Sequence, residues 1–188
     1  TDYTLAARTY GFRIDTKVWD GEVLENLGIE GSLFPPVKPS GAPLGYVREE
    51  VASLLGLGGE VPVAVSGHDH SCAAMAVGAF EPGIVYDSMG TAESLMGTLP
   101  EGPLGEAEVT SGLTFGCHIL PGYMFWMGGQ AHAGGSVEWL RNLLSQEKLS
   151  YRDLEELVDS SSPGPSGIVY LPYLSGSASP WPDGQVRG

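Results

Sequence analysis

The stretch from Val61 to Ala79 constrains the fold more than any other part of the sequence, because its hydrophobic pattern changes within a few residues. Val61 to Val65 is a short apolar run rich in β-branched residues, which predicts a buried strand. The small residues from Ser71 to Ala79 predict a helix packed closely on a sheet. Asp69 therefore lies at a strand-to-helix junction, where a carboxylate tends to stay ionised. This segment alone leaves two interpretations of Asp69 open, a structural helix cap and a base at the edge of a cleft.

A second segment, from Gly83 to Leu95, predicts two strands joined by a tight turn at Gly90-Thr91. Backbone N–H groups in such a turn can hold a phosphate. Residues 67–95 together read GHDHSCAAMAVGAFEPGIVYDSMGTAESL. This segment resembles the FGGY carbohydrate kinases, the family of glycerol, xylulose, gluconate and fuculose kinases.

The resemblance extends over nearly the whole chain. Residues 2–9 are similar to the family pattern D-x-S-x-A-x-R-T, and residues 15–20 to a segment that ends in Trp-Asp. Residues 134–141 resemble a G-x-x-x-x-W-L-R helix, and residues 167–188 a further family segment. One departure is Ser177-Ala178, which stands where the family usually carries Glu-Arg. A charged contact from that position is therefore not expected here.

The resemblance implies an α/β fold of the actin-like ATPase (ribonuclease H-like) kind. Residues 1–80 would form the end of the N-terminal, sugar-binding lobe, and residues 81–188 the start of the C-terminal, nucleotide-binding lobe, with the boundary near Glu81-Pro82. We therefore expect the chain to be an internal segment of a longer kinase and to be inactive alone. The resemblance cannot choose the sugar or polyol.

The resemblance also assigns roles to individual residues. Asp69 would be the general base that accepts the proton of the attacking hydroxyl, and Asp69 and His70 would contact the substrate. The remaining expected positions bind the nucleotide: Gly90, Thr91, Gly134 and Glu138. The implied cofactors are ATP and Mg²⁺. A non-catalytic ligand-binding or regulatory member of the same fold is the alternative, since fold does not fix function.

Composition limits the function classes independently. The 188 residues carry a formal charge of −14 with a pI near 4.4, which argues against nucleic-acid or anionic membrane surfaces as partners. No apolar run approaches the roughly 20 residues of a membrane span, so a cytoplasmic location is expected. The resemblance also allows a homodimer. Cys72 and Cys117 are too few for a disulfide scaffold, and we expect buried thiols.

The histidines offer a competing interpretation, a metal site for a hydrolase. His68 and His70 flank Asp69, while His118 and His132 lie far away in the sequence. Neither a helical H-x-x-x-H nor an H-E-x-x-H pattern is present, and His68 and His70 need not converge at the end of a strand. We therefore assign no metal ligand.

The remaining pattern predicts mostly short elements. The N-terminal half is expected to contain, in order, a helix or loop at 1–12, a turn at 15–20, a helix from Gly21 that ends at Gly28, a Pro-rich connector at 34–41 and an amphipathic helix at 47–57 ended by Gly58-Gly59. The C-terminal half is expected to contain a hairpin of residues 112–118 and 123–128, helices at 133–144 and 151–158, and a buried strand at 168–171.

Overall fold

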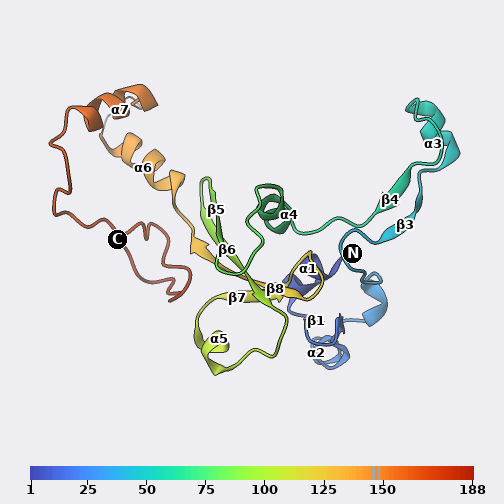
Figure 1. The fold of residues 1–188 in the computed structure, drawn as a ribbon. Coiled ribbons are helices and arrows are strands. Elements are labelled where there is room, and N and C mark those ends of the chain that lie inside the picture. The colour runs from blue at the N-terminus through green and yellow to red at the C-terminus, as the bar shows by residue number, and fades with distance from the viewer. Residues whose placement is uncertain (145–146, 148) are drawn as a thin grey trace. The chain divides into compact units, whose positions relative to one another are not determined.

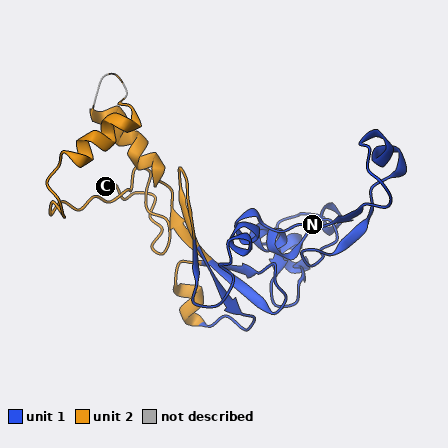
Figure 2. Ribbon diagram, turned by 45° about the horizontal axis from the view of Figure 1, so that its top comes forward, with its two compact units in different colours: residues 1–86, 96–105, 114–126 blue, residues 87–95, 106–113, 127–188 orange. Residues whose placement is uncertain are grey.

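The structure is a computed structural model that describes residues 1–144, 147 and 149–188. Its contacts divide the chain into two compact units (Figure 2), each of which is described by itself. The first comprises residues 1–86, 96–105 and 114–126, and the second comprises residues 87–95, 106–113 and 127–188. Because strands β5, β6 and β8 have residues in both, the boundary between the units crosses these strands.

Figure 1 shows the helices and strands along the chain. Up to residue 76 they are α1 (Tyr3–Ala6), η1 (Ala7–Thr9), β1 (Phe12–Arg13), β2 (Val18–Trp19), α2 (Gly21–Asn26), η2 (Gly31–Leu33), β3 (Pro43–Tyr46), α3 (Glu49–Leu54), β4 (Pro62–Ala64) and α4 (Asp69–Ala76). After residue 76 they are β5 (Val85–Met89), β6 (Glu93–Pro100), α5 (Glu106–Thr110), β7 (Thr114–Cys117), β8 (Tyr123–Gln130), α6 (Gly134–Leu144) and α7 (Tyr151–Asp159).

A small core fixes the N-terminal segment in the first unit. Ala6, Phe12 and Cys117 are buried together. The Phe12 ring stacks on Tyr3 at a centroid distance of 6.0 Å and meets Trp19 edge-on at 5.5 Å. Burial raises the pKa of the Cys117 thiol to about 11, so this cysteine is an inert core residue, as expected. Cys72 is only half-buried.

Helix α2 forms as its sequence predicts. The Asp20 carboxylate accepts hydrogen bonds from the N–H groups of Glu22 and Val23, both at 3.1 Å, and so caps the helix N-terminus. Leu24 is the buried residue of the helix. Gly28 has a φ of +66°, the left-handed conformation that commonly follows a helix C-terminus.

A four-stranded sheet with the strand order β5-β6-β8-β7 contains both predicted hairpins. β5 and β6 are joined by the Gly90-Thr91 turn, and β7 and β8 by the loop that contains Gly122. Two glycines allow close packing between β6 and β8. A Cβ atom at Gly97 would lie 2.3 Å from the Trp126 indole, and one at Gly129 would lie 2.0 Å from the Glu93 carbonyl oxygen.

The predicted strand at 61–65 forms, but the prediction that it is buried is wrong. β4 pairs antiparallel with β3 in a two-stranded sheet, and all three of its residues are exposed. A two-stranded ribbon has no second layer of its own to cover its faces, which explains the exposure. The predicted helix at 47–57 is also shorter than expected, because α3 gives way to Gly56 at φ +67° rather than to Gly58-Gly59.

The prediction of a buried strand at 168–171 is wrong. Ile168 and Val169 are 83% and 82% exposed, and the segment has no strand assignment. A strand needs a neighbour that accepts and donates its backbone hydrogen bonds. Among the described residues, no strand pairs with 168–171.

The two C-terminal helices form as predicted and contact each other through Arg141. This side chain is buried, and its guanidinium lies 3.8 Å from the centroid of the Tyr151 ring. Its Nε donates to the Leu149 carbonyl at 2.6 Å. Ser150 and Asp153 form a capping box at the start of α7.

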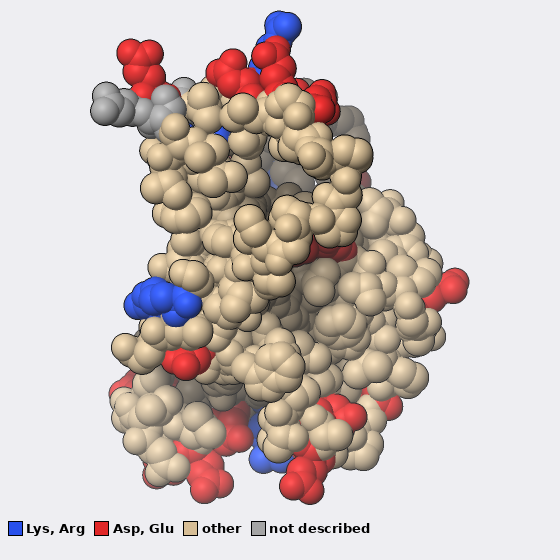
Figure 3. Space-filling model, turned by 90° about the vertical axis from the view of Figure 1, so that its left-hand side faces the viewer, with Lys and Arg blue, Asp and Glu red and all other residues tan. Residues whose placement is uncertain are grey.

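Charged side chains occupy little of the face shown in Figure 3. Uncharged residues cover most of that face, and the acidic side chains stand mainly at its upper and lower ends. None of the described helices is long and apolar enough to cross a bilayer.

Candidate active site

Asp69 is the first residue of α4, and the preceding His68 occupies the N-cap position. The interpretation of Asp69 as the helix cap is therefore wrong. The Asp69 carboxylate instead accepts a hydrogen bond at 2.8 Å from the N–H of His70, within the first turn. Its side chain is 84% exposed. The geometry thus presents a carboxylate to solvent from the rigid start of a helix.

The electrostatic surroundings keep Asp69 ionised. Hydrogen bonds from the His70 side chain and then from the His70 N–H lower the pKa of the carboxyl group below its ordinary value. At neutral pH the group is an acceptor for a proton or for a hydroxyl hydrogen. A carboxylate of lowered pKa is a weak base, so its contribution to catalysis would be mainly to orient a hydroxyl.

His68 and His70 lie close to Asp69, closer than the sequence spacing led us to expect. Asp69 Oδ1 is 3.4 Å from His68 Nε2 and 3.0 Å from His70 Nδ1, and one ligand atom from each residue lies within 4.8 Å of the others. Burial lowers the pKa of His68, which favours its neutral form. Asp69 Oδ1 accepts the His70 N–H, whereas the buried Nδ1 of His68 has no hydrogen-bond partner among the described residues. The sequence prediction assigned no metal to these residues, and that assignment stays a prediction.

Helix α4 is held against the rest of the first unit by its buried face. Ser71 and Ala74 are fully buried, and the Ser71 hydroxyl donates to the sulfur of Met96 at 3.7 Å. Before the helix start, a Cβ atom at Gly67 would lie 2.5 Å from Ile119 Cγ2. The chain around Asp69 is therefore closely packed although the carboxylate itself is exposed.

The Gly90-Thr91 turn and the start of α6 are joined by backbone hydrogen bonds within the second unit. Gly134 N–H donates to the Gly90 carbonyl at 2.9 Å, and the N–H groups of Ala133 and Gly135 donate to the Thr91 carbonyl at 2.9 and 3.0 Å. A Cβ atom at Gly134 would lie 2.7 Å from the Gly90 oxygen. Glycine is thus required here for the contact between turn and helix, a reason that the sequence did not suggest.

The turn itself has room for a ligand. A Cβ atom at Gly90 would have only one neighbour within 4 Å, the Ala92 oxygen at 3.7 Å. Gly90 and Thr91 are both exposed, but the Gly90 N–H already donates to that same oxygen at 2.8 Å. The predicted phosphate donors therefore differ in availability, and Thr91 is the more available of the two.

Glu138 lies one helical turn beyond Gly134 and is engaged with its neighbours. Its Oε2 accepts from Arg141 at 2.8 Å and from the Tyr151 hydroxyl at 3.4 Å. The predicted site residues are thus divided between the units. Asp69 and His70 belong to the first unit, and Gly90, Thr91, Gly134 and Glu138 belong to the second.

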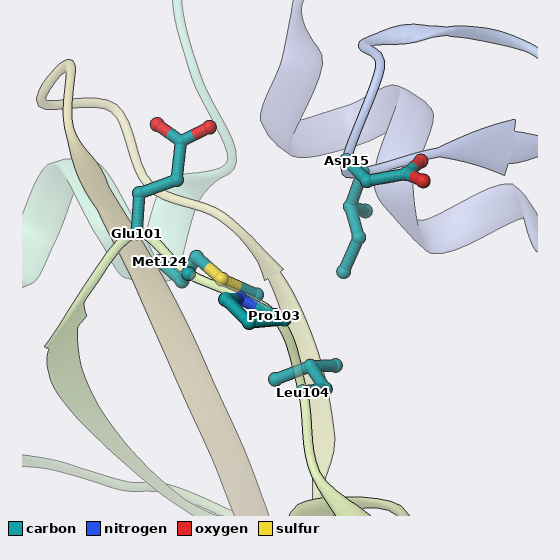
Figure 4. Close-up of a pocket in the computed structure, with 7 residues that line it drawn as sticks. Asp15, Glu101, Pro103, Leu104 and Met124 are labelled. Carbon is teal, nitrogen blue, oxygen red and sulfur yellow. The ribbon is translucent and has the colours of Figure 1, made fainter.

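The first unit also contains a cavity of about 490 Å³ that includes none of the predicted site residues. Figure 4 shows Pro103, Leu104 and Met124 close together and the Glu101 carboxylate turned away from them. Glu101 pairs with Lys17 at 2.6 Å, and Asp15 pairs with Arg13 at 2.8 Å. Both carboxylates at this cavity therefore already have cationic partners.

Comparison with known proteins connects these features to one family. Residues 1–76 match the N-terminal domain of the FGGY family of carbohydrate kinases. The whole chain is 30% identical to the xylulose kinase of Lactococcus lactis subsp. lactis (strain IL1403), of which it covers 36%. The chain thus resembles the FGGY carbohydrate kinases in sequence. It spans a little over a third of the length of the curated relatives that it matches.

Solved xylulose and glycerol kinases share the fold of this chain. The xylulose kinase from Lactobacillus acidophilus matches all of the chain and 37% of its own length, with a TM-score of 0.83 and 20% identity. The Plasmodium falciparum glycerol kinase with ADP matches 96% of the chain and 35% of its own length, with a TM-score of 0.77 and 22% identity. The actin-like ATPase fold expected from the sequence is confirmed.

One functional candidate was missed by the sequence reasoning. The Thr4 hydroxyl accepts a hydrogen bond at 2.6 Å from the N–H of His68, the residue before Asp69. The signal was present, since Thr4 lies in the D-x-S-x-A-x-R-T segment on which part of the resemblance rests. The pattern gave no indication that this segment contacts the residue that precedes the predicted base.

Proposed function

We propose that this chain forms part of a kinase that transfers the γ-phosphoryl group of ATP to a hydroxyl of a small sugar or polyol. The observation that carries the proposal is Asp69, an ionised and exposed carboxylate on a closely packed helix start, in a chain that resembles the FGGY kinases. Asp69 would accept the proton of the attacking hydroxyl and hold its oxygen in line with the phosphorus. His70, hydrogen-bonded to Asp69, would contact the same substrate.

The nucleotide would be held by residues of the second unit. Thr91 would donate to phosphate oxygens, and Gly90 would leave the space that they occupy. Gly134 would allow α6 to begin beside the turn, and Glu138 would lie one turn further along the nucleotide site. We further propose a sugar-binding domain in residues 1–80 and a nucleotide-binding domain in residues 81–188. The compact units divide the chain differently, since residues 96–105 and 114–126 belong with residues 1–86.

One residue of the first unit, Asp69, suits Mg²⁺ as a ligand. Mg²⁺ prefers oxygen ligands and keeps several waters, and the Asp69 carboxylate is an exposed oxygen ligand that could contact the ion through water. When bound, the ion would neutralise charge on the phosphates.

The experiment that tests the proposal is a phosphorylation screen of the full-length protein. ADP release would be measured with pentuloses, gluconate, deoxyhexoses and glycerol, beginning with xylulose because several of the similar proteins are xylulose kinases. We expect ADP release that depends on one of these compounds. Binding of a sugar without any ATP turnover would instead support the alternative, a non-catalytic ligand-binding or regulatory member of the fold.

A further inference from the structure

A buried carboxylate organises the beginning of the chain. Asp2 is 1% exposed and precedes α1 as its N-cap. Its Oδ2 accepts hydrogen bonds from the Thr4 hydroxyl at 2.6 Å, the Thr4 N–H at 2.8 Å and the Ser40 hydroxyl at 2.9 Å. Its Oδ1 accepts from the Leu5 N–H at 3.3 Å. Asp2 thus fixes the position and the rotamer of the fully buried Thr4.

The bonding of Asp2 decides what the Thr4 hydroxyl can do. A threonine hydroxyl has one proton to donate and two lone pairs that can accept. Because the proton is directed to Asp2, the oxygen is left as an acceptor. The N–H of His68 donates to it at 2.6 Å, across 64 positions of sequence. The Thr4 end of this bond is fully buried and the bond as a whole is partly buried, so leaving the Thr4 oxygen without its donor is costly.

Packing at Gly67 also restricts the same peptide. A Cβ atom at Gly67 would lie 3.2 Å from the Ser40 oxygen and 3.3 Å from the Cys72 sulfur, in addition to its contact with Ile119. Ser40 therefore both donates to Asp2 and packs beside Gly67. The peptide that joins Gly67 to His68 therefore has little freedom to move. The next peptide along the chain joins His68 to Asp69.

We propose that Thr4, oriented by Asp2, is a positioning residue for Asp69. The proposal rests on the proposed function, in which Asp69 is the base. Fixing the His68 amide sets where α4 begins and in which direction the Cα–Cβ bond of Asp69 points. Asp69 needs this support because its own side chain is mostly exposed and touches little besides His68 and His70. Thr4 does not touch the substrate in this scheme and acts only through the backbone.

The first test compares three variants of the full-length protein. Thr4→Val keeps the shape of the side chain and loses both hydroxyl hydrogen bonds, and we expect kcat to fall about tenfold to a hundredfold, as small misplacements of a catalytic group do. The KM for ATP should stay within about twofold, because the nucleotide residues lie in the other unit. Thr4→Ser, which keeps the hydroxyl, should restore most of kcat. Thr9→Val is the matched control, since Thr9 bonds the Ala6 carbonyl and not the Asp69 loop.

The deciding measurement repeats Thr4→Val in an Asp69→Asn background. A positioning residue that acts through Asp69 loses its effect on kcat once the base is gone, so the double variant should be no slower than Asp69→Asn alone. A residue that only stabilises the fold would lower kcat by the same factor in both backgrounds. That outcome, or an unchanged kcat in Thr4→Val, would overturn the proposal.

Two comparisons separate this proposal from the proposed function. A wild-type protein without sugar-dependent turnover, or an Asp69→Asn variant with normal kcat, would refute the function itself. Loss of kcat in Asp69→Asn with normal kcat in Thr4→Val refutes only the role of Thr4. If Thr4→Val does not fold, Ser40→Ala carries the same test, since it removes one donor from Asp2. We expect a several-fold lower kcat from it, and no change would overturn the proposal.

Discussion

At the scale of single residues, the hydrogen bonds of Asp69 and its solvent exposure affect the carboxylate in different ways. The bonds from His70 stabilise the ionised form, and the exposure leaves the carboxylate oxygens open to a ligand. An isolated carboxylate on a protein surface would be equally exposed, but its orientation would not be fixed. Asp69 gains that direction from residues that are distant in sequence, and this combination suits a group that orients a hydroxyl.

Asp69→Asn should remove most of the turnover of the full-length enzyme without unfolding it. Asparagine keeps the oxygen that accepts the His70 N–H but cannot take up the proton of the substrate hydroxyl. General bases typically contribute a hundred- to ten-thousand-fold, so kcat should fall by about that factor. The check is kcat and melting temperature measured side by side. Near-normal kcat would exclude Asp69 as the base.

His118 should make the protein less stable as the pH falls below 7. The residue is 5% exposed, and burial lowers the pKa of its imidazole. The unfolded state then binds a proton near pH 6.5 while the folded state does not, so the free energy of unfolding decreases from that pH downward. His118→Asn, which keeps an acceptor for the Leu120 N–H, should reduce this slope.

The measurement for His118 is chemical denaturation of wild type and variant between pH 8 and pH 5.5. Both histidine and asparagine are neutral at pH 8, which gives an internal control for any loss of packing. Burial lowers the pKa of His68 as well, so part of the slope should remain in the variant. Identical slopes for the two proteins would show that His118 is not responsible.

At the scale of secondary structure elements, glycines decide how closely neighbouring elements approach. Gly134 lets α6 begin against the Gly90 carbonyl, and Gly97 makes room for the Trp126 indole between β6 and β8. Gly90 is different, because its Cβ position is open. The first two positions are constrained by the fold, whereas a side chain at Gly90 would extend into the space that we assign to phosphate.

Gly90→Val should therefore weaken the use of ATP and leave the fold intact. The added side chain would occupy phosphate space in the proposed site, and losing one charge-assisted contact of about 1.5–3 kcal/mol corresponds to roughly a tenfold to hundredfold loss of affinity. We expect the KM for ATP to rise by about that factor, with sugar binding and melting temperature nearly unchanged. Normal KM and kcat would remove this turn from the nucleotide site.

Gly97→Ala should destabilise the protein by about 1–3 kcal/mol, as overpacking usually does. The new methyl group would overlap the Trp126 ring, which is rigid and cannot move aside easily. Gly102→Ala is the matched control, because a Cβ atom there has no neighbour within 4 Å, and its effect should be within about 0.5 kcal/mol. Urea denaturation measures the stability of both variants. Equal denaturation midpoints for Gly97→Ala and Gly102→Ala would contradict the prediction.

At the scale of the whole molecule, apolar side chains remain exposed in both units. Tyr46 and Leu54 are 62% and 84% exposed in the first unit, and Ile168 and Trp181 are 83% and 81% exposed in the second. Contiguous exposed apolar patches mark contact surfaces, whereas single exposed apolar residues are common on any protein surface. The chain also matches little more than a third of its relatives.

The 188-residue chain by itself is expected to show no sugar kinase activity. It covers a limited share of the related kinases and leaves the apolar residues described above exposed. The assay is sugar-dependent ADP release by the purified chain, with the full-length protein as the positive control. Turnover by the chain alone, free of contaminating kinase, would contradict the expectation.

The sequence alone determined the features that depend on neighbouring residues. The Gly28 end of α2, the two hairpins and the two C-terminal helices follow from short-range hydrogen bonds and backbone preferences. The resemblance to the FGGY kinases rests on local patterns of the same kind, because each motif consists of residues that are close together in the sequence.

Only the tertiary structure decided which distant residues meet. The bond from the His68 amide to Thr4 spans 64 positions, and the reason for glycine at position 134 is a carbonyl 44 positions earlier in the chain. It also decided burial, since β4 and residues 168–171 are apolar in sequence and yet exposed. Burial and long-range contacts depend on how separate elements pack, and no local pattern specifies that packing.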